Sequence, residues 1–154
     1  MTSAQGKITK AGTGRKLLYA GQDMHVLAEP QDGFEGFSAA EMVVPSRFAG
    51  PIAHIHDGFD EALYILEGRL LLTYGTDEPV EADAGSFCLA PRGVRHTFAN
   101  PDGIEARVLG IWAPATIGLD FMTAIGAALP GDGGRPDPAV MTALYEAHHS
   151  RLVP

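Results

Sequence analysis

The sequence predicts an all-β fold, either a sandwich or a small antiparallel β-barrel, followed by two C-terminal α-helices. The first observation is a series of short apolar runs between residues 17 and 114, most of them bounded by Gly, Pro, Asn or Asp, which is typical of strands. The second is that no helical segment separates these runs, which argues against βαβ units. The third is a change to helical spacing after Pro114.

Residues 1–16 are polar and are expected to form a flexible N-terminal arm. Residues 17–114 are expected to form the β-domain, because strand-length runs follow one another there. In order, the runs are LLYA, MHVLAE, GFSAAEMVVP, IAHIH, EALYILEG, RLLLTYG, PVEADAG, SFCLAP, RHTFAN and EARVLGIWAP. The chain contains 19 glycines and 11 prolines, and turns between short strands require these residue types.

Residues 115–154 are expected to form a helical tail that packs on the β-domain or at a dimer contact. A first helix is predicted from an apolar residue at every fourth position, namely Ile117, Phe121, Ile125 and Leu129. Asp137 followed by Pro138 has the pattern of an N-cap with proline at the first helical position. The second helix is expected to present one face formed by Val140, Met141, Leu144, Tyr145 and His148.

The composition excludes several classes of function. A chain of 154 residues has the length of one domain. Its net charge of −8 and pI of about 5.1 indicate an acidic surface that repels phosphate, so we expect no nucleic-acid partner. No apolar stretch has the length of a membrane span, and the N-terminus lacks the apolar core of a signal peptide. We therefore expect a cytoplasmic protein that does not contact membranes.

Potential metal ligands cluster in IAHIHDGFDEALYILEG, residues 52–68. Because side chains alternate between the two faces of a strand, His54 and His56 are expected to point to the same side. The turn-forming sequence DGFD then allows Glu61, which opens the next strand, to return to that side. Two imidazoles and a carboxylate suit a divalent ion such as Fe, Mn, Co, Ni, Cu or Zn.

A second stretch, GSFCLAPRGVRHTFAN at residues 85–100, adds His96. Its pattern G-x5-P-x-G-x2-H-x3-N resembles the second signature motif of the cupin family, and H-x-H-x4-E-x6-G from residue 54 resembles the first. The resemblance implies a double-stranded β-helix, or jelly roll. It also implies that one divalent transition metal per chain, whose identity the ligands do not select, is held by His54, His56, Glu61 and His96. Cupins are commonly dimers, so a homodimer is expected as well.

Strand alternation also predicts what lines the interior. Leu63 and Ile65 should point inward if Glu61 does, and Phe98 should point inward if His96 does. Met42 is a further candidate from an earlier strand, while Phe48 and Trp112 are candidates for an aromatic rim or for core packing. A mostly apolar pocket with a metal at one end is suited to a small organic or aromatic substrate.

The chain as a whole resembles the quercetin 2,3-dioxygenase-like single-domain cupins. This resemblance implies an oxygenase that uses O2 to cleave a flavonol-like or other enolic substrate, in which Glu61 is the catalytic base. An apolar cavity would raise the pKa of such a base. Two alternatives stay open: a non-oxidative isomerase or cyclase that uses the same ion as a Lewis acid, and a module that binds a small molecule without catalysis.

Overall fold

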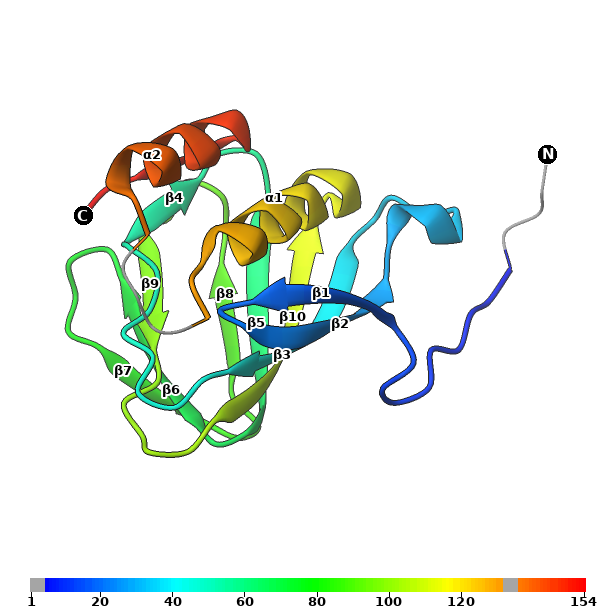
Figure 1. Cartoon of the computed structure of the whole chain (residues 1–154), viewed down its shortest axis with the longest axis horizontal. Coiled ribbons are helices and arrows are strands. Elements are labelled where there is room, and N and C mark those ends of the chain that lie inside the picture. Colours follow the sequence, from blue (N-terminus) through cyan, green and yellow to red (C-terminus); the bar gives the residue numbers. More distant parts are fainter. Residues whose placement is uncertain (1–4, 132–135) are drawn as a thin grey trace.

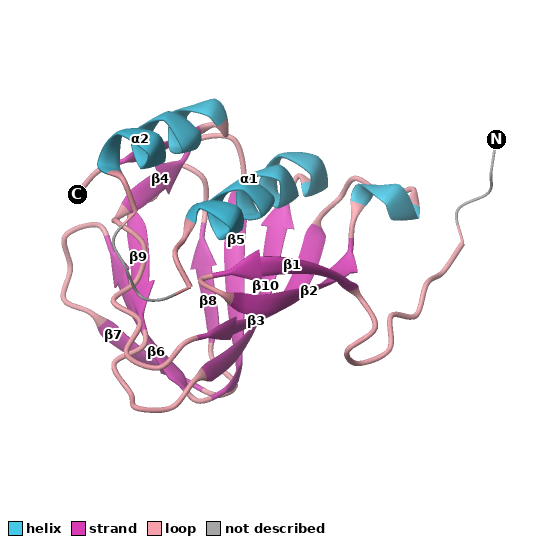
Figure 2. Ribbon diagram, in the orientation of Figure 1, coloured by secondary structure: helices cyan, strands magenta, loops and turns pink. Residues whose placement is uncertain are grey.

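The computed structural model describes residues 5–131 and 136–154, so the first four residues of the predicted arm and residues 132–135 of the predicted tail lie outside the described residues. Within the described residues the chain forms two antiparallel sheets and two C-terminal α-helices (Figures 1 and 2). The predicted jelly-roll barrel with two C-terminal helices is therefore confirmed. The strands are β1 (Arg15–Tyr19), β2 (Gln22–Ala28), β3 (Ser38–Val44), β4 (His54–His56), β5 (Asp60–Glu67), β6 (Arg69–Tyr74), β7 (Val80–Asp83), β8 (Phe87–Ala90), β9 (His96–Ala99), β10 (Ala106–Ala113) and β11 (Ser150–Leu152).

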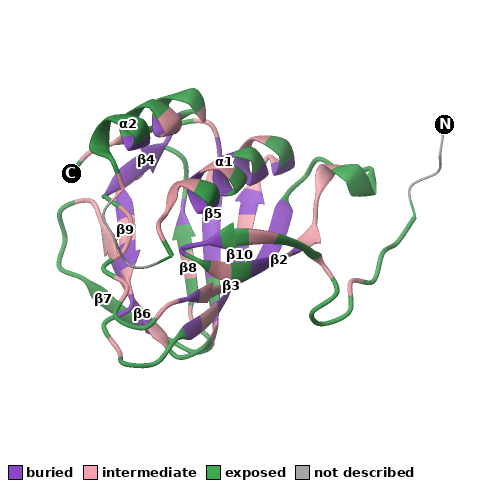
Figure 3. Ribbon diagram, viewed as in Figure 1, coloured by how far each residue is buried: buried purple, intermediate pink, exposed green. Residues whose placement is uncertain are grey.

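The two sheets bring distant parts of the chain together. One sheet has the order β1-β2-β3-β10-β5-β8, and the other has the order β11-β4-β9-β6-β7. Strands β4 and β5 are consecutive in the sequence but belong to different sheets, so the short turn at residues 57–59 crosses from one sheet to the other. The hydrophobic core lies between the sheets, where Val44, Ile65 and Leu70 have no exposed surface (Figure 3).

The helices are α1 (Ala115–Ala128) and α2 (Pro138–Ala147), with a short 3-10 helix at Pro30–Asp32. Helix α1 lies beside β1 and α2 lies beside β11 (Figure 1). Within the predicted stripe of α1, Phe121 and Ile125 are buried. The approach of α1 to β1 is close, because a Cβ at Gly126 would lie 1.9 Å from the carbonyl oxygen of Leu18. Only a glycine fits at this contact.

Helix α2 begins as its sequence predicts. The Asp137 side chain accepts hydrogen bonds from the backbone N–H groups of Ala139 and Val140, with proline at the start of the helix. Of the predicted face, Met141 and Tyr145 are buried, whereas Val140 is 56% exposed. The buried face is therefore narrower than the sequence pattern predicts.

Two features at the chain ends lie outside the sequence prediction. Strand β1 begins at Arg15, inside the segment 1–16, and Lys7 pairs with Asp32 at 2.7 Å. After α2 the chain forms β11, which pairs antiparallel with β4 and sets Ser150 opposite His56. In the described part of the chain, neither α-helix combines the length and apolarity that a bilayer crossing requires.

Candidate metal centre

The four predicted ligands meet at one end of the barrel. His54 and His56 lie on β4, Glu61 lies on β5 and His96 opens β9. His54 and His96 are direct cross-strand partners. The chain reaches His96 through a turn in which Gly93 has a φ of 86° and its N–H donates to the carbonyl oxygen of His56 at 2.8 Å. This left-handed conformation favours glycine.

The ligand atoms are close together and buried. One ring nitrogen from each of His54, His56 and His96 lies within 4.8 Å of the others. The Glu61 carboxylate faces two of these rings, with Oε1 3.4 Å from His96 Nε2 and Oε2 3.6 Å from His56 Nε2. All four residues are buried. We call these four side chains the ligand cluster.

Each imidazole is held from behind through its Nδ1. The Nδ1 atoms of His54 and His96 lie 2.7 and 3.0 Å from the carbonyl oxygens of Ile52 and Val94. Carbonyl oxygens only accept hydrogen bonds, so both Nδ1 atoms carry the proton. In a neutral ring with this tautomer, Nε2 presents a lone pair toward the cluster.

The third ring has a side-chain partner from the C-terminal strand. His56 Nδ1 lies 2.7 Å from Ser150 Oγ. The Ser150 hydroxyl donates in turn to the carbonyl oxygen of His148 at 3.1 Å. It therefore uses its only proton on His148 and accepts from His56, which fixes the same tautomer in this ring as in the other two.

This arrangement fits a bound cation. Among the described residues, the buried Nε2 atoms of His56 and His96 have no hydrogen-bond partner, although such atoms are normally paired. A lone pair that faces a carboxylate oxygen at these distances is repelled unless a proton or a metal ion lies between them. Three imidazoles and one carboxylate form a donor set that divalent transition metals accept, so the residues present fit such an ion.

The ionisation of the cluster follows from burial and from its mutual contacts. Burial favours the neutral form of Glu61, but contacts with His56 and His96 outweigh it and hold the pKa of Glu61 well below its ordinary value. The expectation of a raised pKa for this carboxyl is therefore wrong. Burial, reinforced by the charges of His96 and His56, lowers the pKa of His54 to about 3. Burial also opposes protonation of His96, but Glu61 outweighs it and raises the pKa of His96.

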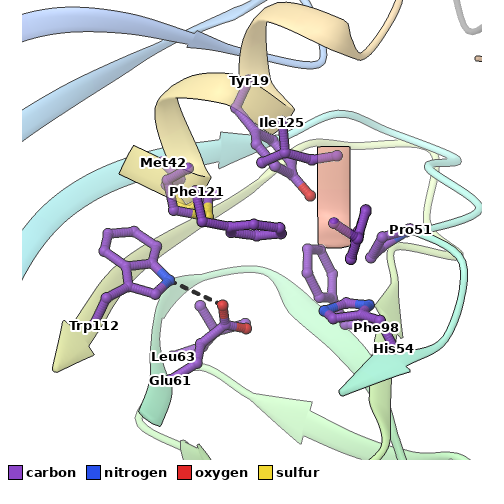
Figure 4. Close-up of a pocket in the computed structure, with 12 residues that line it drawn as sticks. Tyr19, Met42, Pro51, His54, Glu61, Leu63, Phe98, Trp112, Phe121 and Ile125 are labelled. Atoms are coloured by element: carbon purple, nitrogen blue, oxygen red, sulfur yellow. Dashed lines mark hydrogen bonds between the residues drawn. The ribbon is translucent and has the colours of Figure 1, made fainter. Parts of the chain in front are cut away.

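A tryptophan fixes the carboxylate. Trp112 Nε1–H donates to Glu61 Oε2 at 2.9 Å, and this tryptophan has no exposed surface (Figure 4). Aromatic rings surround the histidines: Phe59 stacks on His56 with ring centroids 4.1 Å apart, and Tyr145 meets His54 edge to face at 5.1 Å. The imidazole planes are thus held by packing as well as by hydrogen bonds.

A small cavity lies between the ligand cluster and the elements that close the barrel. Four of the predicted pocket residues line it: Met42, Leu63, Phe98 and Trp112. The other two lie elsewhere, because Ile65 is in the core and Phe48 packs against Tyr19 and Phe98. The cavity measures about 20 Å³, which is room for about one water molecule.

The cavity is closed by residues that sequence reasoning did not assign to the site. We call this group the cover: Tyr19 from β1, Phe121, Met122 and Ile125 from α1, and Tyr145 from α2. The helical stripes predicted that Phe121, Ile125 and Tyr145 are buried, but not what they are buried against. Ser150, the partner of His56, carries no signal in the sequence, because its role depends on β11 lying beside β4.

The comparisons agree with the fold and with the ligand motifs. Residues 40–112 match the family described as Cupin domain. This match, together with the jelly-roll architecture, supports membership of the cupin superfamily. None of the curated proteins matches this chain by sequence.

Several solved structures share the fold. KdgF from Halomonas sp. is 16% identical, covers 71% of this chain and 94% of its own, and has a TM-score of 0.60. The polyketide cyclase RemF from Streptomyces resistomycificus is 21% identical over 70% of this chain and 79% of its own, also with a TM-score of 0.60. An RmlC-like cupin with a double-stranded β-helix fold from Methanocaldococcus jannaschii is 18% identical over 78% and 99%, with a TM-score of 0.51. At these identities the likeness concerns the fold alone.

Proposed function

We propose that this chain is a metal-dependent enzyme that removes a proton from a small enolisable substrate, and that the resulting enolate reacts with O2. The observation that supports this proposal is the ligand cluster itself: buried imidazoles whose Nε2 atoms converge, next to a carboxylate that faces two of them. A purely structural role does not require lone pairs to be aimed at one point and left without partners.

The residues that would hold the metal are His54, His56 and His96, with Glu61 beside them. When bound, a divalent transition metal supplies Lewis acidity toward an enol or hydroxyl oxygen of the substrate. The chain supplies the rest. Glu61 is the only carboxylate that lines the cavity, and its low pKa keeps it ionised, which is the state that a proton acceptor needs.

The hydrogen bonds of Glu61 divide its two oxygens between two roles. Oε2 accepts from Trp112 Nε1, which fixes the plane of the carboxylate. Oε1 lies toward His96 and is the oxygen on which we place the transferred proton. Once Nε2 of His56 and His96 no longer shares a proton with Glu61, the contacts that lower its pKa are removed and the carboxylate becomes a stronger base.

The size of the cavity favours a small substrate over a flavonol. Pockets for drug-sized ligands enclose roughly 300–1,000 Å³, whereas this cavity measures about 20 Å³. A flavonol would require the cover to move away from the barrel. A compact enolisable compound requires a much smaller displacement, and the apolar lining matches a ligand with few polar groups.

The first step is shared by the oxidative and the non-oxidative reactions. Proton removal generates an enolate, which reacts with O2 in a dioxygenase but is reprotonated in an isomerase or attacks a carbonyl in a cyclase. The resemblance to quercetin 2,3-dioxygenase-like cupins favours O2, whereas a polyketide cyclase shares the fold. Oxygen consumption therefore separates these reactions, and proton removal can be measured independently of it.

The experiment uses acetylacetone, a small compound that is partly enolised, with a flavonol as the large probe. Apoprotein is loaded in turn with Fe(II), Mn(II), Co(II), Ni(II), Cu(II) or Zn(II), and metal content is measured. Oxygen uptake follows oxygenation, and NMR in deuterated water follows exchange at the carbon that loses its proton. We expect both signals with acetylacetone for at least one metal, and slower or no uptake with the flavonol.

Two variants serve as controls. Glu61→Gln keeps the shape and the acceptor for Trp112 but cannot take up a proton, so it should retain metal and lose exchange. His25→Ala alters a histidine that lies outside the cluster on β2 and should behave as the unmodified protein. Exchange without oxygen uptake would favour the isomerase or cyclase. Neither signal from fully loaded protein would contradict the proposal and leave binding without catalysis.

A further inference from the structure

The polar groups of the cavity lie on two sides that come from different parts of the fold. The barrel side carries the His54 ring and the Glu61 carboxylate, while most of the remaining lining is apolar. Trp112 already donates its N–H to Glu61. The other polar groups in the lining are the hydroxyls of Tyr19 and Tyr145, and both belong to the cover.

These two tyrosines are buried to an extent that requires an explanation. Tyr19 is 3% exposed and Tyr145 is 1% exposed. Within residues 5–131 and 136–154, neither hydroxyl takes part in a hydrogen bond between the protein groups described above or elsewhere. The Tyr19 side chain reaches down from the cover, with its hydroxyl directed into the cavity (Figure 4). Burying a hydroxyl without a partner costs roughly 1–3 kcal/mol.

Their protonation state defines what they can recognise. Burial, together with the nearby Tyr145 and Glu61, raises the pKa of Tyr19 well above its ordinary value. Burial and Glu61 likewise raise the pKa of Tyr145. Both phenols therefore keep their protons at neutral pH and can donate a hydrogen bond. An oxygen that accepts such bonds is the natural partner.

We propose that Tyr19 and Tyr145 are substrate-positioning residues that form a second recognition point opposite the ligand cluster. The ligand then carries two oxygen functions at the ends of a short carbon chain. One faces His54 and Glu61, and the other is a carbonyl or hydroxyl oxygen that accepts hydrogen bonds from the tyrosines. This inference rests on the proposed function and narrows its substrate to small dioxygenated compounds, such as oxo acids or diketones.

The test measures binding and needs no turnover. Protein loaded with Co(II) is titrated with pyruvate, acetoacetate and levulinate, and separately with propionate, butyrate and pentanoate, which have the same chain lengths but lack the oxo group. Changes in the visible Co(II) spectrum report affinity. We expect at least one oxo acid to bind roughly fivefold to tenfold more tightly than its counterpart, the gain that one or two neutral hydrogen bonds provide.

The variants Tyr19→Phe and Tyr145→Phe remove only the hydroxyls. Each should reduce or abolish the preference for the oxo acid, while metal content and the affinity for the matched alkanoate stay unchanged. Tyr64→Phe is the matched control, because Tyr64 is 38% exposed and lies outside the cavity. It should keep the full preference. A purely structural role of the tyrosines would change both series of acids equally.

The outcomes are distinct. No preference for any oxo acid in the unmodified protein would overturn the inference, as would a preference that survives in both phenylalanine variants. Failure of the proposed function appears earlier, as absence of the Co(II) spectrum before any acid is added, and that result overturns the inference with it.

Discussion

The ligand cluster and the cover form one cavity but are built in different ways. The ligand cluster comes from adjacent barrel strands, and each histidine is fixed by an acceptor behind it. The cover comes from β1 and the C-terminal tail, and its tyrosine hydroxyls have no such acceptor among the described residues. The cluster is thus preorganised by the barrel, whereas the cover has polar capacity left for a ligand. This difference separates metal binding from substrate selection.

The largest effect is expected from breaking the ligand cluster. His96→Ala removes one ring and leaves Glu61 with a single imidazole neighbour. Losing an outer hydrogen-bond partner of a metal ligand costs roughly 10- to 100-fold in affinity, so losing a ligand should cost more. Isothermal titration with Zn(II) measures the change. His25→Ala should bind as the unmodified protein does, and equal losses in both variants would contradict the assignment.

The next effect should come from the packing of the cover. Gly126→Ala places a methyl group 1.9 Å from the Leu18 carbonyl oxygen, a position that neither helix nor strand can vacate cheaply. Overpacking of this kind typically costs about 1–3 kcal/mol, whereas helix propensity alone would stabilise the variant by about 1 kcal/mol.

Urea unfolding distinguishes these two signs. Ala127→Gly serves as the control on the exposed side of the same helix, and it should cost about 1 kcal/mol through propensity alone. Stabilisation by Gly126→Ala would show that α1 is not held against β1 in the way the structure indicates.

Ser150→Ala tests the one hydrogen bond that connects the tail to the ligand cluster. Without its hydroxyl, His56 Nδ1–H is buried and unpaired, and the ring is free to change its tautomer or tilt. We expect metal affinity to fall by about 10-fold with little change in the other ligands. Ser150→Thr, which keeps the hydroxyl, should restore most of the affinity. A Thr variant as weak as the Ala variant would indicate a packing effect instead.

The smallest effect is the pH dependence of metal binding. Glu61 raises the pKa of His96, so below that pKa the ion must displace a proton. Affinity should fall as pH is lowered, by up to about tenfold per pH unit for each proton displaced. His54, with a pKa of about 3, should add nothing to this slope above pH 5. Zn(II) titrations between pH 5.5 and 8 measure it, and a flat profile would contradict the coupling.

The ligand cluster could be predicted because its geometry is local. Strand alternation places His54 and His56 on one side, and the spacing to Glu61 and His96 matches a known pattern. The cover could be predicted only in part, since a helical stripe shows that Tyr145 is buried but not that it faces a cavity. The sign of the Glu61 pKa shift was wrong for a similar reason. Burial alone raises it, and only the three-dimensional contacts with His56 and His96 reverse the result.

The position of Ser150 in the chain has a consequence for biosynthesis. A nascent chain emerges from its N-terminal end, so all four metal ligands leave the ribosome before α1, α2 and β11 do. During that interval a barrel that has already formed would present its histidines to the surrounding solution, with no helix above them. The order of synthesis therefore offers a natural moment for the ion to enter, and completion of β11 would then retain it.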